Sequence, residues 1–240
     1  MVSSPCGPVT VLPSSSVYRI INSLLLRWCL LLATIGVAAG GPPILPAFAA
    51  PPQRQIVILG DSLSAGYGIA LDETWVAGLT RRLAGQDLPY RVTNASISGE
   101  TSSGGLSRLP QLLETFAPDL VVIELGANDG LRGISLEELR RNLVASIELV
   151  QASGAGAVLV GMELPPNYGP AYQAAFRSVF ADVAETTGVP LTPFILNGIA
   201  TNNDLMQDDG LHPRGGAGER ILDNLWPTLR AVLEERSGES

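Results

Sequence analysis

The chain of 240 residues contains no lysine, a single histidine and two cysteines. Both cysteines, Cys6 and Cys29, lie among the first 50 residues. Beyond residue 50 the sequence therefore excludes a disulfide, a cysteine nucleophile and a thiolate metal site. The single histidine excludes a histidine-rich metal centre, and the lack of lysine excludes a Walker-type phosphate loop and a lysine Schiff base. Serine, histidine and carboxylate chemistry is what remains.

Positive charge is scarce throughout the sequence. Fifteen arginines stand against 23 acidic residues, a net charge of −8 at pH 7. Without the first 50 residues, 13 arginines remain against the same 23 acidic residues, a net charge of −10. An acidic domain without a basic stripe is a poor binder of nucleic acid, so we expect no nucleic-acid partner.

The first 50 residues differ in composition from the rest. They contain no acidic residue, and Arg27 precedes an apolar run at 28–39 and a small-x-small site at 47–49. This order is typical of a secretory signal peptide. The alternative is a membrane anchor, but the run is shorter than the roughly 18 to 20 apolar residues needed to span a bilayer. We predict a cleaved signal peptide over 1–50 and one domain over 51–240, periplasmic or secreted and without stable membrane insertion.

Short apolar runs alternate with stretches of helical spacing in the rest of the chain. Runs that are apolar throughout suit parallel strands covered on both faces, and they lie at 56–60, 91–96, 120–126, 157–162 and 189–194. Helical spacing occurs at 74–85, 135–154, 169–188 and 215–235. A capping box is expected at Ser135 and Glu138, and 94–105 is interpreted as a loop rich in glycine and serine. This alternation predicts an α/β domain with a parallel sheet.

Residues suited to acyl-transfer chemistry follow the predicted strands. Ligands of such sheets bind beyond the carboxyl ends of the strands. Ser62 follows the first predicted strand and Gly99 follows the second. Asn128 follows the third strand, and a turn that contains Asp209 and His212 comes after the fifth. Each has an ordinary explanation as a turn or helix cap. Together they supply a nucleophile, a base, an orienting carboxylate and amide donors for an oxyanion.

Four motifs resemble a known family. They are "GDSLSAGYG" at 60–68, "NASISGETSSGGLSRLP" at 94–110, "LVVIELGANDGLRG" at 120–133 and "QDDGLHP" at 207–213. In this order they resemble the four sequence blocks of the GDSL or SGNH hydrolases. The match is closest to the bacterial periplasmic acyl-CoA thioesterases that also act as lysophospholipases and arylesterases. No G-x-S-x-G is present, which argues against the α/β-hydrolase elbow.

The resemblance implies a three-layer α/β/α sandwich with a flavodoxin-like sheet. It implies a serine hydrolase of acyl esters and thioesters, with Ser62 as nucleophile, His212 as base and Asp209 as the orienting carboxylate. The oxyanion hole would be formed by the Ser62 amide, the Gly99 amide and the Asn128 side chain. We expect small-molecule acyl substrates, no cofactor, no metal ion and a monomeric protein.

Two other functions are compatible with the fold. One is a carbohydrate O-deacetylase, against which the "LPPNYG" loop at 164–169 argues, because in the thioesterase-like members this loop borders the acyl pocket. The other is a non-catalytic binding protein, against which the intact serine, histidine and aspartate argue. The sequence does not rank thioesters, aryl esters and lysophospholipids. With His212 as the only histidine, it predicts a single ionisation on the acid limb of the activity.

Overall fold

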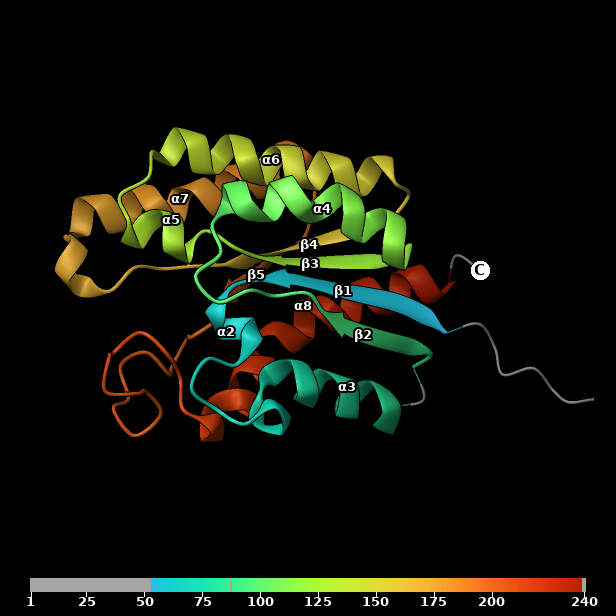
Figure 1. Cartoon of the computed structure of the whole chain (residues 1–240), viewed down its shortest axis with the longest axis horizontal. Helices are drawn as coiled ribbons and strands as arrows, with labels where there is room; N and C mark the ends of the chain where they lie inside the picture. The colour runs from blue at the N-terminus through green and yellow to red at the C-terminus, as the bar shows by residue number, and fades with distance from the viewer. Residues whose placement is uncertain (1–52, 87, 239–240) are drawn as a thin grey trace, which may run out of the picture. The chain divides into compact units, whose positions relative to one another are not determined.

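The computed structural model describes residues 53–86 and 88–238, and the predicted signal peptide lies outside these ranges. Five parallel strands form one sheet in the order β2-β1-β3-β4-β5 (Figure 1). Their bounds are β1 Arg54–Gly60, β2 Tyr90–Asn94, β3 Leu120–Glu124, β4 Gly156–Gly161 and β5 Leu191–Phe194. Every predicted strand is present, with its ends within two residues of the prediction.

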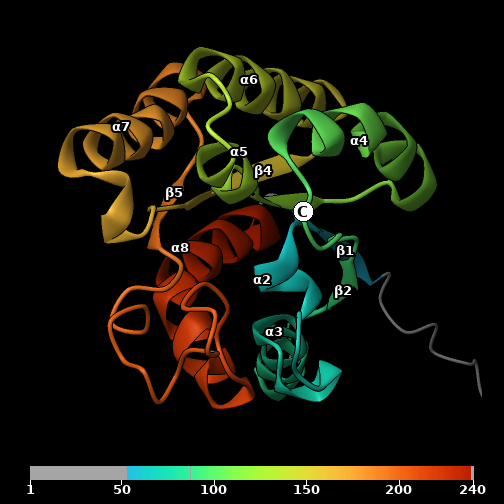
Figure 2. The same ribbon diagram turned by 60° about the vertical axis from the view of Figure 1, so that its left-hand side comes forward.

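Helices cover both faces of the sheet, as Figures 1 and 2 show. One face carries α2 (Ser62–Ala65), α3 (Trp75–Gly85) and α8 (Gly218–Gly238). The other carries α4 (Ser102–Phe116), α5 (Ala127–Leu131), α6 (Leu136–Ala152) and α7 (Pro170–Thr187). Short 3₁₀ turns lie at Leu71–Glu73, Pro166–Tyr168 and Gly215–Ala217. The predicted three-layer α/β/α sandwich is confirmed.

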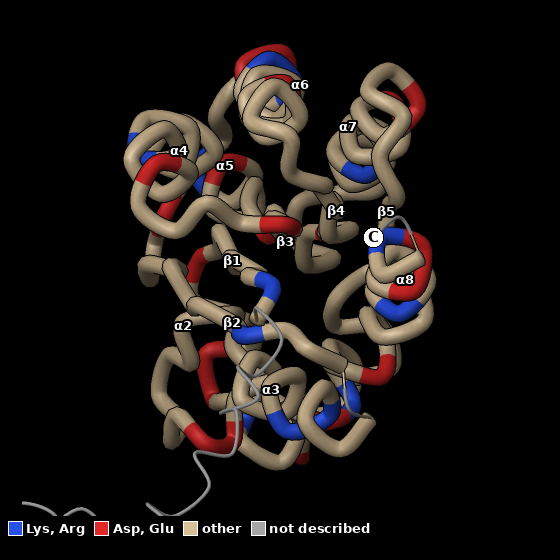
Figure 3. The backbone as a smooth tube through the Cα atoms, turned by 90° about the vertical axis from the view of Figure 1, so that its right-hand side faces the viewer, with Lys and Arg blue, Asp and Glu red and all other residues tan. Residues whose placement is uncertain are grey.

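The central strands are apolar because both of their faces are covered. All five residues of β3 are buried, as are six of the seven in β1. Most charged residues lie on the surrounding helices and loops (Figure 3). Within the two described ranges, no helix combines the length and the apolar character needed to cross a bilayer.

Two local predictions were wrong. The segment interpreted as a loop contains the start of α4, which the Thr101 side chain caps by accepting from the Gly104 N–H at 3.2 Å. A Cβ on Gly105 would lie 2.2 Å from Leu125 Cδ1, so this glycine lets the helix lie directly over the end of β3. The capping box at the start of α6 does not form, because the Ser135 side chain makes no capping hydrogen bond.

The strand order determines where a site can form. The chain passes from β1 outward to β2 and then back to β3 on the other side of β1, so the connections diverge between β1 and β3. Such a switch point is where doubly wound sheets bind ligands. Gly60 at the end of β1 pairs with Glu124 at the end of β3. The loops that begin with Asp61 and Leu125 therefore start side by side.

Candidate active site

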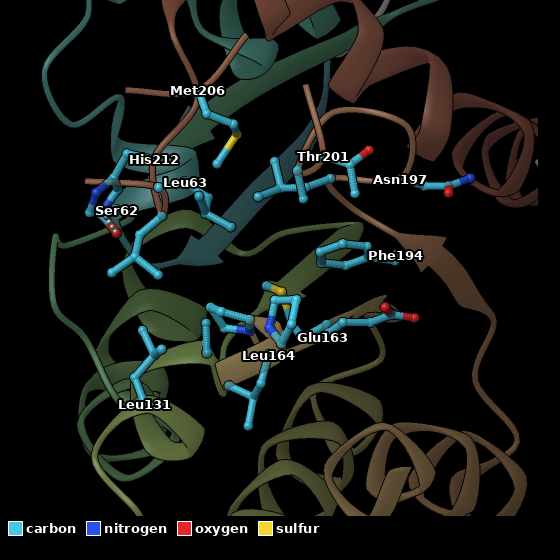
Figure 4. Close-up of a pocket in the computed structure, with 18 of the residues that line it drawn as sticks. Ser62, Leu63, Leu131, Glu163, Leu164, Phe194, Asn197, Thr201, Met206 and His212 are labelled. Atoms are coloured by element: carbon cyan, nitrogen blue, oxygen red, sulfur yellow. Dashed lines mark hydrogen bonds between the residues drawn. The ribbon is translucent and has the colours of Figure 1, made fainter. Parts of the chain in front are cut away.

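Ser62, His212 and Asp209 form a continuous hydrogen-bonded series. Ser62 is the first residue of α2, and its Oγ lies 2.9 Å from Nε2 of His212 (Figure 4). On the other side of the ring, Nδ1 lies 2.6 Å from Oδ2 of Asp209. Because an ionised carboxylate only accepts hydrogen bonds, Nδ1 carries the ring proton. Nε2 is then free to accept from the serine hydroxyl.

Asp209 is held in its ionised form. Partial burial raises the pKa of this carboxyl, but hydrogen bonds from the His212 ring and from the backbone N–H groups of His212 and Leu211 outweigh that effect and lower the pKa to about 2. The two backbone donors bind Oδ1 at 3.0 and 2.9 Å, which leaves Oδ2 for the imidazole. The aspartate therefore orients the ring throughout the neutral pH range.

The loop that carries His212 is fixed to the segment that follows α2. The Gln207 side-chain amide donates to the carbonyl oxygens of Tyr67 and Pro213 at 2.8 and 2.9 Å. The Gln207 backbone N–H donates to the His212 carbonyl oxygen at 2.7 Å. The Tyr67 ring packs against the imidazole with a centroid separation of 4.5 Å. These contacts hold the imidazole next to Ser62 even though the loop is largely exposed.

Asn128 and Gly99 are bridged by Arg132, a residue that none of the expected site roles included. The Arg132 guanidinium donates to the Gly99 carbonyl oxygen at 2.9 Å and to Asn128 Oδ1 at 3.5 Å. Asn128 Nδ2 donates in turn to Oδ2 of Asp61 at 3.0 Å. Gly99 has a φ of +81°, a conformation that favours glycine. The Ser62 N–H, at the first position of a helix, has no intrahelical partner.

Two buried acids, Asp61 and Glu124, lie next to these groups and were not among the expected site residues. Asp61 is 1% exposed and Glu124 is fully buried. The signal was visible in the sequence, since Glu124 is the one charged residue in the apolar run "LVVIELG". Burial raises the pKa of Asp61 to about 6. Burial, together with the charge of Asp61, raises the pKa of Glu124 well above its usual range.

Ser64, two residues after Ser62, is occupied by structural contacts. Its hydroxyl is buried, donates to Glu124 Oε2 at 2.5 Å and accepts from the Trp75 indole N–H at 3.2 Å. Ser62 instead opens onto a cleft and has the imidazole beside it. Of the two serines in the first motif, only Ser62 is placed to attack a ligand.

The cleft has a volume of about 630 Å³ and begins at Ser62, Asn128 and His212. Figure 4 shows Ser62 and His212 at one side, with Phe194 and Glu163 towards the other. The walls are largely apolar and include Leu63, Leu131, Met162, Leu164, Phe194, Leu196 and Met206. Among the described residues, no group of three or more histidine, cysteine, aspartate or glutamate side chains could hold a metal ion.

A doubly wound sheet with serine, histidine and aspartate aligned at its switch point has the architecture of a serine hydrolase. Residues 58–219 match the model of the GDSL-like Lipase/Acylhydrolase family. The chain belongs to this family, and it is a serine ester hydrolase.

Individual relatives agree with this assignment. The chain is 48% identical over 180 residues to Esterase TesA of Pseudomonas aeruginosa, covering 75% of this chain and 90% of that protein. It is 38% identical over 194 residues to thioesterase 1/protease 1/lysophospholipase L1 of Escherichia coli K12, covering 81% and 92%. Among solved structures, the psychrotrophic esterase EstA of Pseudoalteromonas sp., inhibited by monoethylphosphonate, superimposes with a TM-score of 0.72 at 43% identity, covering 75% and 99%.

Proposed function

We propose that this enzyme hydrolyses carboxylic esters and thioesters of apolar acyl chains through an acyl-enzyme on Ser62. The observation that carries the proposal is the alignment of Ser62 Oγ, the His212 ring and Asp209, with separations of 2.9 and 2.6 Å, at the mouth of an apolar cleft. A nucleophile, its base and the orienter of that base are the three elements of activated serine catalysis.

The reaction proceeds in two halves. As Ser62 Oγ attacks the acyl carbonyl carbon, His212 Nε2 takes the hydroxyl proton, and a tetrahedral oxyanion forms. The same proton passes to the leaving alcohol or thiol when its bond to the acyl carbon breaks. In the second half, His212 takes a proton from water as the water attacks the acyl-enzyme, and then returns a proton to Ser62. One histidine suffices because it acts alternately as base and acid.

The oxyanion is assigned three donors: the N–H groups of Ser62 and Gly99 and the side-chain amide of Asn128. These groups follow the neighbouring strands β1, β2 and β3. Charge that appears only after attack is stabilised most effectively by donors that are already oriented. The structure offers such orientation at Asn128, whose amide is held by Asp61 on one side and Arg132 on the other.

The lining of the cleft favours an acyl chain as the part of the substrate that binds there. Leu164, Pro165 and Pro166 of the "LPPNYG" loop form part of its wall. An apolar wall in this position suits a hydrocarbon chain better than an acetylated sugar, whose hydroxyl groups would lose hydrogen bonds to water against these three side chains. This contact favours an esterase or thioesterase over a carbohydrate O-deacetylase. The names of the relatives, an esterase and a thioesterase with lysophospholipase activity, are consistent with the same substrate range.

For the cellular setting, our proposal is based on the composition of the N-terminal segment. A signal peptide over 1–50 would export the domain to the periplasm or the medium as a monomer that acts on small-molecule substrates. A net charge of −10 after cleavage would disfavour binding to nucleic acid.

The test is a chain-length series of p-nitrophenyl esters and acyl-CoAs, from acetate to laurate, run beside an acetylated xylooligosaccharide. We expect kcat/KM to rise from acetate to the longer chains, and Ser62→Ala to abolish turnover of every substrate. Faster turnover of the acetylated sugar than of any longer acyl ester would contradict the proposal.

A further inference from the structure

A hydrogen-bonded chain of buried groups runs behind the catalytic serine to Asn128. The Trp75 indole donates to Ser64, and the Ser64 hydroxyl donates to Glu124 Oε2. The same oxygen accepts the backbone N–H of Asp61 at 3.1 Å. Asp61 then accepts from Asn128, so β3 and the segment after β1 are joined through two acids.

The fold makes room for this pair at a specific glycine. A Cβ on Gly60 would lie 2.5 Å from Glu124 Oε2 and 2.8 Å from Ser64 Oγ. Any other residue at position 60 would therefore displace the acid or the serine hydroxyl. The first glycine of the "GDSL" motif allows the carboxyl group to approach the backbone of β1.

Capping alone does not explain two buried acids. Asp61 Oδ1 caps α2 by accepting the Leu63 N–H at 3.0 Å. Serine or asparagine would cap a four-residue helix about as well, without the desolvation cost of a buried carboxylate. The remaining oxygen, Oδ2, accepts a hydrogen bond from Asn128 Nδ2. A capping residue with a shorter side chain, such as serine, would lose this hydrogen bond.

We propose that Asp61, held in place by Glu124, is a positioning residue that fixes the side-chain amide of Asn128 for oxyanion binding. This inference rests on the proposed function. Asp61 accepts and Arg132 donates, so the amide has one orientation that satisfies both, with Nδ2 towards Asp61 and Oδ1 towards Arg132. The two hydrogens of Nδ2 are fixed in the amide plane, so binding one of them to Asp61 sets the direction of the other.

The proton distribution in the pair supports this role. Glu124 Oε1 is buried and has no hydrogen-bond partner among the described residues, so an ionised Glu124 would be poorly stabilised. Burial and the charge of Asp61 raise the pKa of Glu124 well above its usual range, so the pair favours a single negative charge, on Asp61. A single negative charge on the pair matters, because a second anion close to the developing oxyanion would oppose the formation of that oxyanion.

The same arrangement adds an ionisation to the pH profile. The ionisable groups that act on Asp61 are Glu124 from β3 and His212 from the loop before α8. Burial places the pKa of Asp61 at about 6, and protonation weakens its acceptance of the Asn128 amide. The acid limb of kcat/KM should then include the ionisation of Asp61 in addition to the single one predicted from the sequence.

The test is Asp61→Ser, whose hydroxyl can still cap α2 but is too short to reach Asn128. We expect kcat, measured per phosphonate-titrated active site, to fall about tenfold while KM changes little. In an Asn128→Ala background the same substitution should have almost no further effect on kcat, because Asp61 acts through that amide. The acid limb should lose one ionisation in Asp61→Ser.

Asp119→Ser is the matched control. Asp119 also accepts a backbone N–H, that of Gln55 at 2.8 Å, but it precedes β3 and lies at the opposite end of the sheet. Its loss should lower the melting temperature without changing kcat. For the second acid, Glu124→Gln should retain more of kcat than Glu124→Met, because only glutamine can replace the hydrogen bonds of the protonated acid.

Two results would overturn the proposal. One is a kcat for Asp61→Ser within twofold of the wild type, and the other is an equal loss in the wild-type and Asn128→Ala backgrounds. Ser62→Ala, assayed in the same series, separates these failures from failure of the proposed function. If Ser62→Ala remained active, the nucleophile assignment itself would be wrong.

Discussion

The two halves of the active site are built in opposite ways. His212 and its partner Asp209 lie on a loop, with side chains 19% and 39% exposed. Asp61 and Glu124 lie on the other side of Ser62, at the ends of the buried strands β1 and β3. They are 1% and 0% exposed. The half that we propose transfers protons borders solvent, whereas the half that holds Asn128 is part of the core.

This difference corresponds to what each half does. A base that exchanges protons with water and with leaving groups needs access to solvent, and its orientation can be maintained by a few hydrogen bonds such as those of Gln207. Donors to an oxyanion work by being fixed before charge develops, which requires packed surroundings. We therefore expect substitutions in the two halves to differ in rescue, in pH dependence and in their effect on stability.

The largest expected effect comes from the exposed half. His212→Ala should lower kcat by about 10⁴-fold or more, because in the proposed mechanism Ser62 would lose its base. Since the position borders solvent, imidazole added to the assay should restore part of the activity. Equal rescue of Asn128→Ala by imidazole would show that the two halves are not chemically distinct.

In the buried half, Asn128→Ala should lower kcat by about 10²- to 10³-fold with little change in KM, because we propose that its amide binds charge that appears only after attack. The variant should still form a covalent phosphonate adduct, though slowly. Turnover and melting temperature should be measured on the same purified sample. A loss of stability without a loss of turnover would remove Asn128 from the site.

The smallest expected effect concerns stability in the buried half. Burial raises the native pKa of Glu124 above its unfolded value of about 4.3, so the folded protein binds more protons than the unfolded chain between the two values. The free energy of unfolding should therefore fall as the pH rises through that interval. Glu124→Gln removes this term, so the free energy of unfolding of the variant should fall less than that of the wild type as the pH rises from acid to alkaline values.

Urea unfolding at several pH values would measure this change. Glu148→Gln, the same substitution at an exposed position of α6, is the control and should follow the wild-type curve. Parallel curves for wild type and Glu124→Gln would contradict a buried acid with a raised pKa.

The exposed half was the easier one to predict from sequence. Asp209 and His212 are three residues apart, and their contact is local, so a short motif contains most of it. The parallel strands were also predictable, because continuous apolar runs reflect burial on both faces. Their alternation with helices predicted an α/β domain with a parallel sheet, whereas the three-layer arrangement was implied by the resemblance to the GDSL or SGNH hydrolases.

Features that depend on distant contacts were not predictable in the same way. The backbone N–H of Asp61 donates to the side chain of Glu124, which lies 63 residues further along the chain. No local sequence pattern indicates that partner. The helix α4 was missed because Gly104, Gly105 and Pro110 all have low helix propensity. Packing of Gly105 against Leu125 overrides that propensity, and packing of this kind is decided only in three dimensions.

The central claim, an acyl-enzyme on Ser62, is tested most directly by mass spectrometry after labelling with a p-nitrophenyl phosphonate. Cleavage at arginine releases Gln55–Arg81, which contains both Ser62 and Ser64. The account predicts a single adduct, mapped by fragmentation to Ser62, which is absent from Ser62→Ala and still forms in Ser64→Ala. An adduct on Ser64, or one that survives Ser62→Ala, would contradict it.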